Sequence, residues 1–158
     1  MKNQEIQNLF NALQNIPDTK KMKFDYAVLK NLKTLTPIVR SFNEKIKISN
    51  ELKTFDSERI KICREFAEKT DTGEPKIERG IYKFPNEEAS SLCTKKIDEL
   101  RSTEPHKTAV DEYEKQMKDY DEFMQQETEV ELFKVNIEHV PDGIPRPLLN
   151  EILPMIEE

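Results

Sequence analysis

A long apolar pattern in the first half of the chain constrains the fold most. Within KFDYAVLKNLKTLTPIVRSFNEKI, residues 23–46, apolar residues recur at alternating intervals of four and three positions. They are Val28, Leu32, Leu35, Val39, Phe42 and Ile46. This spacing is the coiled-coil repeat, which places one apolar stripe along one face of a helix. After a shift of register the pattern resumes through Leu52, Phe55, Ile60, Cys63 and Phe66. We therefore expect a helical region from about Phe24 to Lys69, whose apolar face needs a partner.

A second helical pattern, over about residues 87–126, can supply that partner. In two antiparallel helices the sequence numbers of facing residues have a constant sum, and here apolar residues pair at sums of 155 or 156. The pairs are Leu32–Phe123, Leu35–Tyr120, Val39–Met117, Phe42–Tyr113, Ile46–Val110, Phe55–Leu100, Cys63–Cys93 and Phe66–Ala89. The chain would turn near residue 78, where glycines and prolines cluster between residues 73 and 85. The sequence thus predicts a long, coiled-coil-like antiparallel hairpin of residues 24–126, with a turn and a short strand near residues 70–86.

Two prolines fall inside these helical patterns. Proline in a helix interior removes a hydrogen bond and costs about 3 kcal/mol. We expect a kinked but continuous helix at Pro37; the alternative is that Thr36 caps a new helix that starts at Pro37. Around Pro105, in RSTEPHK, we expect the second helical region to bend or break.

The two ends of the chain have patterns of their own. Residues 3–15 are predicted as a short amphipathic helix, within an N-terminal part of residues 1–20. EVELFKVNIEHV predicts a strand over about residues 129–138, and its natural partner is IERGIYKF, although the sequence leaves that pairing open. A C-terminal helix should present Leu148, Leu149, Ile152 and Leu153 to the N-terminal helix, within a part of residues 128–158.

The composition agrees with this architecture. Charged residues make up 35% of the chain, against roughly 25% in an average domain, and three glycines leave few turns. With 158 residues, a single domain over 1–158 is the default. We expect a mainly α fold with a small β element: a helical hairpin, short terminal helices and a two-stranded sheet.

The charge is polarised along the chain. Residues 1–70 carry 14 Lys/Arg and 9 Asp/Glu, whereas residues 71–158 carry 11 and 22. The densest acidic tract, Glu104 to Glu131, holds ten acids and three lysines. One interpretation is a solvated face that also attracts the basic half. The other is an acidic surface that docks on a basic partner, with candidate partner-binding residues Glu112, Asp119, Asp121 and Glu122.

This charge disfavours direct binding of nucleic acid, although the lysines at positions 20, 21 and 23 form a local basic cluster. No run of 18 apolar residues predicts a membrane span, and the start of the chain lacks the apolar stretch of a signal peptide. We therefore expect a soluble protein that neither spans a membrane nor binds a small molecule.

Residues that could carry catalysis are sparse. The chain contains no glycine-rich phosphate loop and no metal-binding Cys-x-x-Cys or His-Glu-x-x-His motif. We expect His106 and His139 to be surface residues. The predicted register places Cys63 opposite Cys93, where a disulfide is geometrically conceivable but two buried thiols are favoured. The sequence therefore predicts a protein that is not an enzyme, with no cofactor and no metal site.

Three stretches together resemble a family of small proteins encoded by phages and prophages, mostly of Gram-positive hosts. They are FDYAVLKNLKTLTPIVRSF, EFAEKTDTGEPKI with the following YKF, and EVELFKVNIEHVPDGIPRPLLNEILPMIEE. The family pattern has a Tyr-Ala-Val helix, an acidic turn with glycine, a Tyr-x-Phe strand and a C-terminal Met-Ile-Glu-Glu. The resemblance implies a phage origin and an accessory or virion-related role, in the host cytoplasm or in the virion. It supplies no catalytic or binding residues.

Two hypotheses for function follow. In the first, the protein binds a host or phage protein through the acidic helical face and inhibits a host defence or replication factor. In the second, it is a structural accessory of tail or capsid assembly, in which the hairpin forms part of a homo-oligomer. The first predicts binding to a partner that weakens with salt, and the second predicts self-association.

Overall fold

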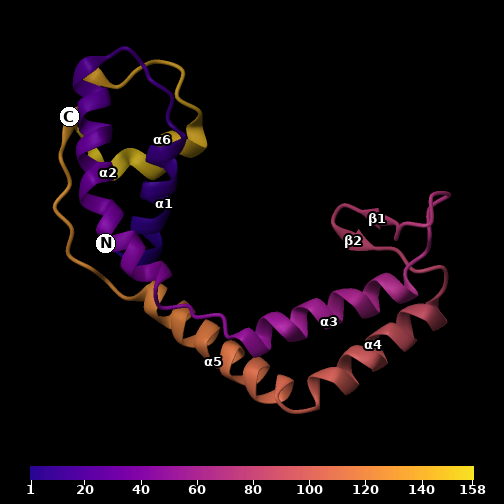
Figure 1. The fold of residues 1–158 in the computed structure, drawn as a ribbon. Helices are drawn as coiled ribbons and strands as arrows, with labels where there is room; N and C mark the ends of the chain where they lie inside the picture. Colours follow the sequence, from indigo (N-terminus) through magenta and orange to yellow (C-terminus); the bar gives the residue numbers. More distant parts are fainter. The chain divides into compact units, whose positions relative to one another are not determined.

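The computed structural model describes residues 1–158 and is mainly helical, as predicted (Figure 1). The helices are α1 (Asn3–Asn15), α2 (Met22–Asn43), α3 (Asn50–Phe66), α4 (Glu87–Arg101), α5 (His106–Gln125) and α6 (Arg146–Ile152). The strands β1 (Ile77–Glu78), β2 (Ile81–Tyr82), β3 (Val135–Asn136) and β4 (Ile156–Glu157) form two small sheets. The chain divides into two compact units: unit 1 comprises Met1–Ile46 and Lys118–Glu158, and unit 2 comprises Lys47–Met117. Helix α5 runs from one unit into the other.

Unit 1 is built on α1, which has the predicted bounds of residues 3–15. Its apolar face packs against α2 and α6, so the predicted contact between the terminal helices is confirmed (Figure 1). The buried cluster of this unit draws residues from both ends of the chain: Ile6, Leu9, Ala12, Leu13, Phe24, Ala27, Val28, Leu35, Val39, Phe42, Met124, Val135, Ile152 and Met155. Leu32 and Phe123 pack at its margin.

Helix α2 continues through Pro37, so the predicted continuous helix is confirmed and a new helix at Pro37 is wrong. The helix ends at Asn43, however, and α3 begins at Asn50. The Ser49 hydroxyl accepts a hydrogen bond from the amide of Leu52 at 3.1 Å and caps the new helix. The helical region expected over residues 24–69 is therefore two helices, separated where the apolar pattern shifts register.

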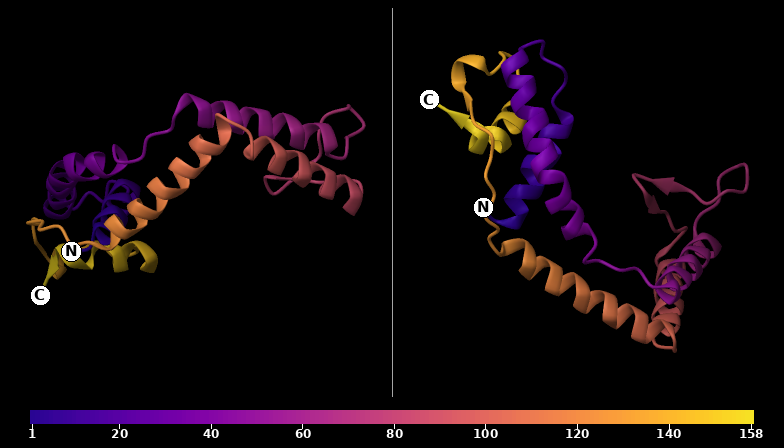
Figure 2. Two further views of the ribbon diagram at one scale, coloured as in Figure 1. Left: turned by 90° about the horizontal axis from the view of Figure 1, so that it is seen from below. Right: turned by 60° about the vertical axis from the view of Figure 1, so that its left-hand side comes forward.

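Unit 2 contains the antiparallel hairpin of α3 and α4, which lie side by side in Figures 1 and 2. The Sγ atoms of Cys63 and Cys93 are 4.0 Å apart, which confirms the register predicted for this pair. Between the helices, β1 and β2 pair antiparallel around a two-residue turn. Arg79 and Gly80 have φ of 52° and 81°, as a type I′ turn requires.

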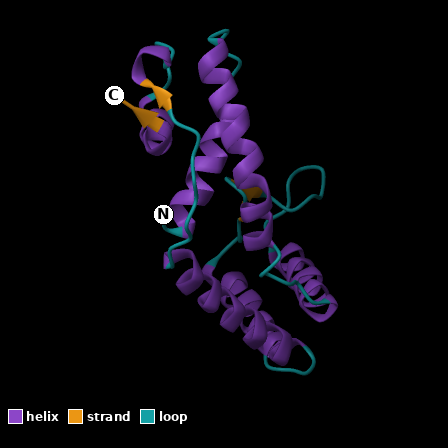
Figure 3. Ribbon diagram, turned by 90° about the vertical axis from the view of Figure 1, so that its left-hand side faces the viewer, coloured by secondary structure: helices purple, strands orange, loops and turns teal.

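The strand predicted over residues 129–138 does not pair with IERGIYKF, the partner expected from the sequence. Ile81 and Tyr82 of IERGIYKF pair with Ile77 and Glu78 of the same segment, because a two-residue turn closes that pairing locally. Within residues 129–138, only Val135 and Asn136 form a strand, and it pairs parallel with β4 (Figure 3). Both strands of this pair belong to unit 1.

The second helical region breaks at residues 102–105, within the expected stretch around Pro105. The predicted register between α2 and α5 does not match the contacts of unit 1. Phe123, expected opposite Leu32, has its ring centroid 5.3 Å from that of Phe42 at an interplanar angle of 77°. The Nζ of Lys45 lies 4.2 Å from the centroid of the same ring. The end of α5 therefore meets the end of α2.

Candidate functional site

The four predicted partner-binding residues lie on α5, and all are exposed. Glu112 belongs to unit 2, whereas Asp119, Asp121 and Glu122 belong to unit 1. A helix turns about 100° per residue, so Asp119 and Asp121 project about 200° apart. Asp119 and Glu122, three positions apart, are neighbours on one face. The structure thus brings together Asp119 and Glu122 and directs Asp121 elsewhere.

Most carboxylates of the acidic tract have no ion-pair partner within the chain. Of the ten acids between Glu104 and Glu131, only Glu114 takes part in an ion pair, with Arg101 at 2.7 Å. The four candidate residues form no ion pair. We use the name acidic α5 surface for the exposed carboxylates of Asp119, Asp121 and Glu122 in unit 1. These carboxylates are free to meet a cationic partner.

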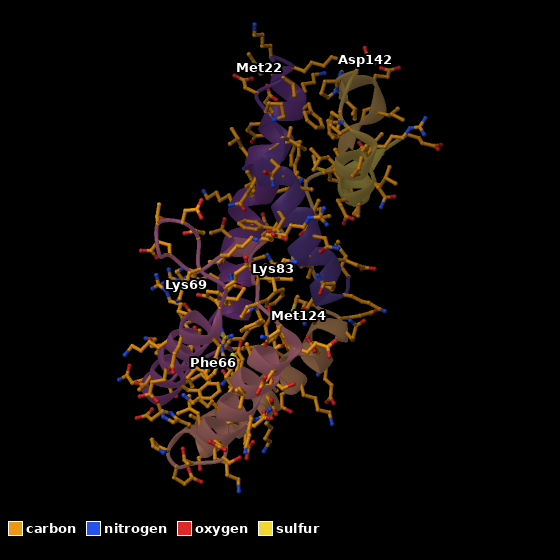
Figure 4. The ribbon with its side chains drawn as sticks, turned by 90° about the vertical axis from the view of Figure 1, so that its right-hand side faces the viewer. Met22, Phe66, Lys69, Lys83, Met124 and Asp142 are labelled. Carbon is orange, nitrogen blue, oxygen red and sulfur yellow. The ribbon has the colours of Figure 1, made fainter.

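Unit 1 also has a groove that sequence reasoning missed. We call it the Tyr26 groove; it has a volume of about 430 Å³ and is lined by Met22, Lys23, Tyr26, Phe133, Lys134, Val135, Asn136, His139 and Glu157. Met22 and Tyr26 are four positions apart on α2 and therefore share a face. Met22 lies at the same end of unit 1 as Asp142 (Figure 4), where the Nζ of Lys21 donates a hydrogen bond to the carbonyl of Val140 at 3.2 Å.

The buried Asn31 positions one wall of the Tyr26 groove. Its Nδ2 donates to the carbonyl of Phe133 at 2.9 Å, and its Oδ1 accepts from the amide of Phe133 at 2.8 Å. The side-chain amide thus pairs with the backbone as a neighbouring strand would. The ring of Phe133 then packs edge-on against Tyr26, with centroids 5.4 Å apart and an interplanar angle of 83°. This geometry is the favourable T-shaped arrangement of two aromatic rings.

Lysines dominate the charge around the Tyr26 groove. The Nζ of Lys23 lies 3.1 Å from Nε2 of His139, and the Nζ of Lys134 donates to the carbonyl of Pro154. The Nζ of Lys30 lies 5.6 Å from the centroid of the Tyr26 ring. None of these lysines pairs with a carboxylate. The groove therefore keeps a local positive charge in a chain whose net charge is −6.

Unit 2 contains an apolar groove of about 530 Å³ between α3 and the first turns of α5. Its lining residues are Ile48, Leu52, Lys53, Phe55, Asp56, Val110, Tyr113 and Glu114. Several of these belong to the apolar pattern that the sequence assigned to a closed interface between helices. Of these, Phe55 and Val110 are buried, whereas Leu52 and Tyr113 are partly exposed at the groove.

Three titratable residues of unit 2, His106, Cys63 and Cys93, are buried. His106 is buried, so the expectation of a surface histidine is wrong for this residue; its Nε2 lies 3.2 Å from Oε2 of Glu58, and its ring packs on Phe55. His106 opens α5, and its side chain turns toward α3. Cys63 and Cys93 are free, buried thiols, as favoured. Burial, and to a lesser degree the neighbouring Cys63, raises the pKa of the Cys93 thiol to about 11, so it stays protonated at neutral pH.

The structure holds no group of three or more His, Cys, Asp or Glu side chains arranged to bind a metal ion. None of its helices combines the length and the apolar character needed to span a membrane. His139, the second histidine, is half-buried beside Lys23 at the Tyr26 groove.

The chain matches no protein-family model, no curated protein sequence and no solved structure.

Proposed function

We propose that this chain is a phage-encoded, non-catalytic protein that acts in the host cytoplasm by binding another protein. The observation that carries the proposal is the set of exposed carboxylates on α5 that have no cationic partner within the chain. A surface of unpaired like charge raises the rate and specificity of association with a surface of opposite charge. A host defence or replication factor with a basic surface is the kind of partner that fits.

The geometry of α5 indicates which carboxylates should contribute most to partner binding. Asp119 and Glu122 share a face, so one partner surface can contact both, while Asp121 projects about 200° away from Asp119. We therefore expect the pair Asp119 and Glu122 to contribute more to binding than Asp121. Exposed ion pairs contribute about 0.2–1 kcal/mol each, so several must act together.

The experiment is affinity purification of the tagged chain from infected cells, followed by measurement of its affinity for the recovered partner. The charge-reversed variant Asp119→Lys/Asp121→Lys/Glu122→Lys should lose the partner. The control Asp71→Lys/Asp98→Lys/Glu99→Lys changes the net charge equally at exposed positions of unit 2 and should retain it. Unchanged recovery of the partner by the first variant would remove the acidic α5 surface from the account.

The alternative is a structural accessory of tail or capsid assembly. Its support is the apolar groove of unit 2, in which Ile48 is 54% exposed, because apolar surface of this kind suits permanent assembly. This function predicts a concentration-dependent oligomer in sedimentation analysis, or recovery of the chain in purified phage particles. A monomer that is absent from particles and binds a host protein would rule it out.

A further inference from the structure

We propose that the Tyr26 groove binds an acidic peptide segment of another protein, one that carries an apolar side chain among its carboxylates. This is a second interaction surface, separate from the acidic α5 surface and opposite to it in charge. The inference does not depend on the proposed function.

Three exposed apolar side chains line the Tyr26 groove. Met22 is 86% exposed, Tyr26 49% and Phe133 46%. All three line one groove, next to the buried Val135. Single exposed apolar residues are normal, but a contiguous set that borders a cavity marks a binding surface. An apolar side chain of a partner would bury this surface.

The groove is also held in shape. Two hydrogen bonds from Asn31 fix the backbone of Phe133, and the pairing of β3 with β4 fixes the residues that follow. The edge-on contact between Tyr26 and Phe133 restrains both rings. A surface formed in advance loses little conformational entropy when a ligand binds, which increases affinity.

Charge selects the kind of ligand. Lys23 and Lys134 line the groove, Lys21 and Lys30 lie next to its residues, and Glu157 is the only acid in the lining. The lysine ammonium groups contact backbone carbonyls, a histidine nitrogen or an aromatic ring, none of which neutralises their charge. A ligand with carboxylates is therefore attracted.

An acidic peptide fits better than a nucleic acid. Single strands bind to aromatic rings and lysines too, but they need a basic track that spans several nucleotides. Here the basic patch is confined to a few lysines, one carboxylate lies within it, and the whole chain has a net charge of −6. Phosphate backbones would be repelled beyond the patch, whereas a short acidic segment would not reach past it.

The test uses the full chain and fluorescein-labelled peptides, with fluorescence anisotropy as the readout. A peptide of alternating Glu and Leu should bind, whereas peptides of alternating Glu and Ser or Lys and Leu should bind at least about tenfold more weakly, a difference of about 1.4 kcal/mol. Labelled oligo-dT should not bind. Tighter binding of oligo-dT than of the Glu-Leu peptide would overturn the proposal in favour of a nucleic-acid surface.

Variants locate the binding. Lys23→Glu/Lys134→Glu should weaken binding of the Glu-Leu peptide at least about tenfold. The control Lys61→Glu/Lys95→Glu, which changes two exposed lysines of unit 2 that form no ion pair, should not. Met22→Ser alters only a highly exposed side chain, so it keeps the fold and should also weaken binding. Equal affinity in the wild type, Met22→Ser and Lys23→Glu/Lys134→Glu would overturn the proposal.

A second copy of this chain is the competing occupant, because its own acidic tract could enter the groove. Sedimentation of the wild type and of Lys23→Glu/Lys134→Glu separates the two cases. A wild-type oligomer that the variant dissolves would overturn the proposal of a foreign peptide. A monomer in both, with peptide binding lost only in the variant, supports it.

Discussion

Asn31 is a polar residue at the centre of unit 1, and it is fully buried. Both polar atoms of its side chain pair with the backbone of Phe133, and its Nδ2 also lies 3.6 Å from the Sδ of Met155. An asparagine in the middle of an amphipathic helix gave no signal of this role in the sequence. Its partner is about a hundred residues away along the chain.

We predict that Asn31→Ala destabilises the protein by about 1–3 kcal/mol, because it removes two hydrogen bonds to the backbone of Phe133, each worth about 0.5–1.5 kcal/mol. Urea unfolding followed by circular dichroism measures this change. Asn11→Ala, at an exposed position of α1, is the control and should stay within about 0.5 kcal/mol of the wild type. A near-neutral Asn31→Ala would contradict the role assigned to the side chain.

The hydrogen bonds that Asp25 accepts should make the stability of the protein depend on pH. The Thr19 hydroxyl, 2.7 Å away, and the Thr19 amide, 3.3 Å away, donate to its carboxylate and hold the pKa of Asp25 below its ordinary value of 3.8. A lowered pKa gives stability that is present above the ordinary value and lost as the pH falls through the folded-state value. Asp25→Asn should therefore be less stable than the wild type at neutral pH by a difference that shrinks in acid.

Melting temperatures of the two proteins, from neutral pH down through 3.8, test this prediction. Asp71→Asn, in the loop after α3, controls for the removal of one negative charge. A difference between wild type and Asp25→Asn that widens in acid would contradict it.

At the scale of the element, Pro37 is an exposed residue inside α2. It has no amide hydrogen to donate to the carbonyl one turn earlier. Pro37→Ala should restore that hydrogen bond and stabilise the protein by up to about 3 kcal/mol. Thermal unfolding measures the gain, with the exposed Thr34→Ala as control. Destabilisation would mean that the packing of Leu35 and Val39 depends on the geometry that proline imposes.

The helices could be predicted from the sequence because their apolar periodicity is a local property. The helix over residues 3–15 and the break near Pro105 agree with the prediction for that reason, and the turn predicted over residues 70–86 lies within the non-helical residues 67–86. The break at residues 44–49 was not predicted. The partner of a helix is not local. An apolar face shows that a helix is buried, not against what, so α2 packs on α1 while α5 was expected. The register was right for Cys63 and Cys93, where α3 and α4 are consecutive helices joined through the β1–β2 hairpin.

The same distinction between local and non-local features applies to the candidate functional surfaces. Exposure of the acidic residues of α5 could be predicted, since ten acids in one tract cannot all be buried. The Tyr26 groove could not, because it joins α2 to Phe133 through a side-chain contact that no periodicity records. The basic cluster at residues 20, 21 and 23 was the one signal that pointed toward it.

At the scale of the whole molecule, the two units differ in their interiors. Every residue of the main hydrophobic cluster belongs to unit 1. The buried residues of unit 2 are mostly small: Phe55, Cys63, Ala67, Cys93, His106, Ala109 and Val110. Local stability follows buried apolar contacts, so unit 2 should open more easily.

Native-state hydrogen exchange measures that difference. Amides of α3 and α4 should exchange before those of α1 and α2, and Leu35→Ala, which costs about 2–5 kcal/mol, should increase exchange in α1 and α2. Equal protection of all four helices would contradict the assignment of the main core to unit 1.

The most direct test of the proposed function is a titration of the recovered partner with the wild-type chain at increasing salt. As salt rises from about 0.1 M to about 1 M, the screening length falls from roughly 10 Å to roughly 3 Å. Binding through the acidic α5 surface predicts that affinity falls steeply over this range and that Asp119→Lys/Glu122→Lys is weaker than the wild type mainly at low salt. An affinity that is independent of salt and equal in both proteins would contradict the account.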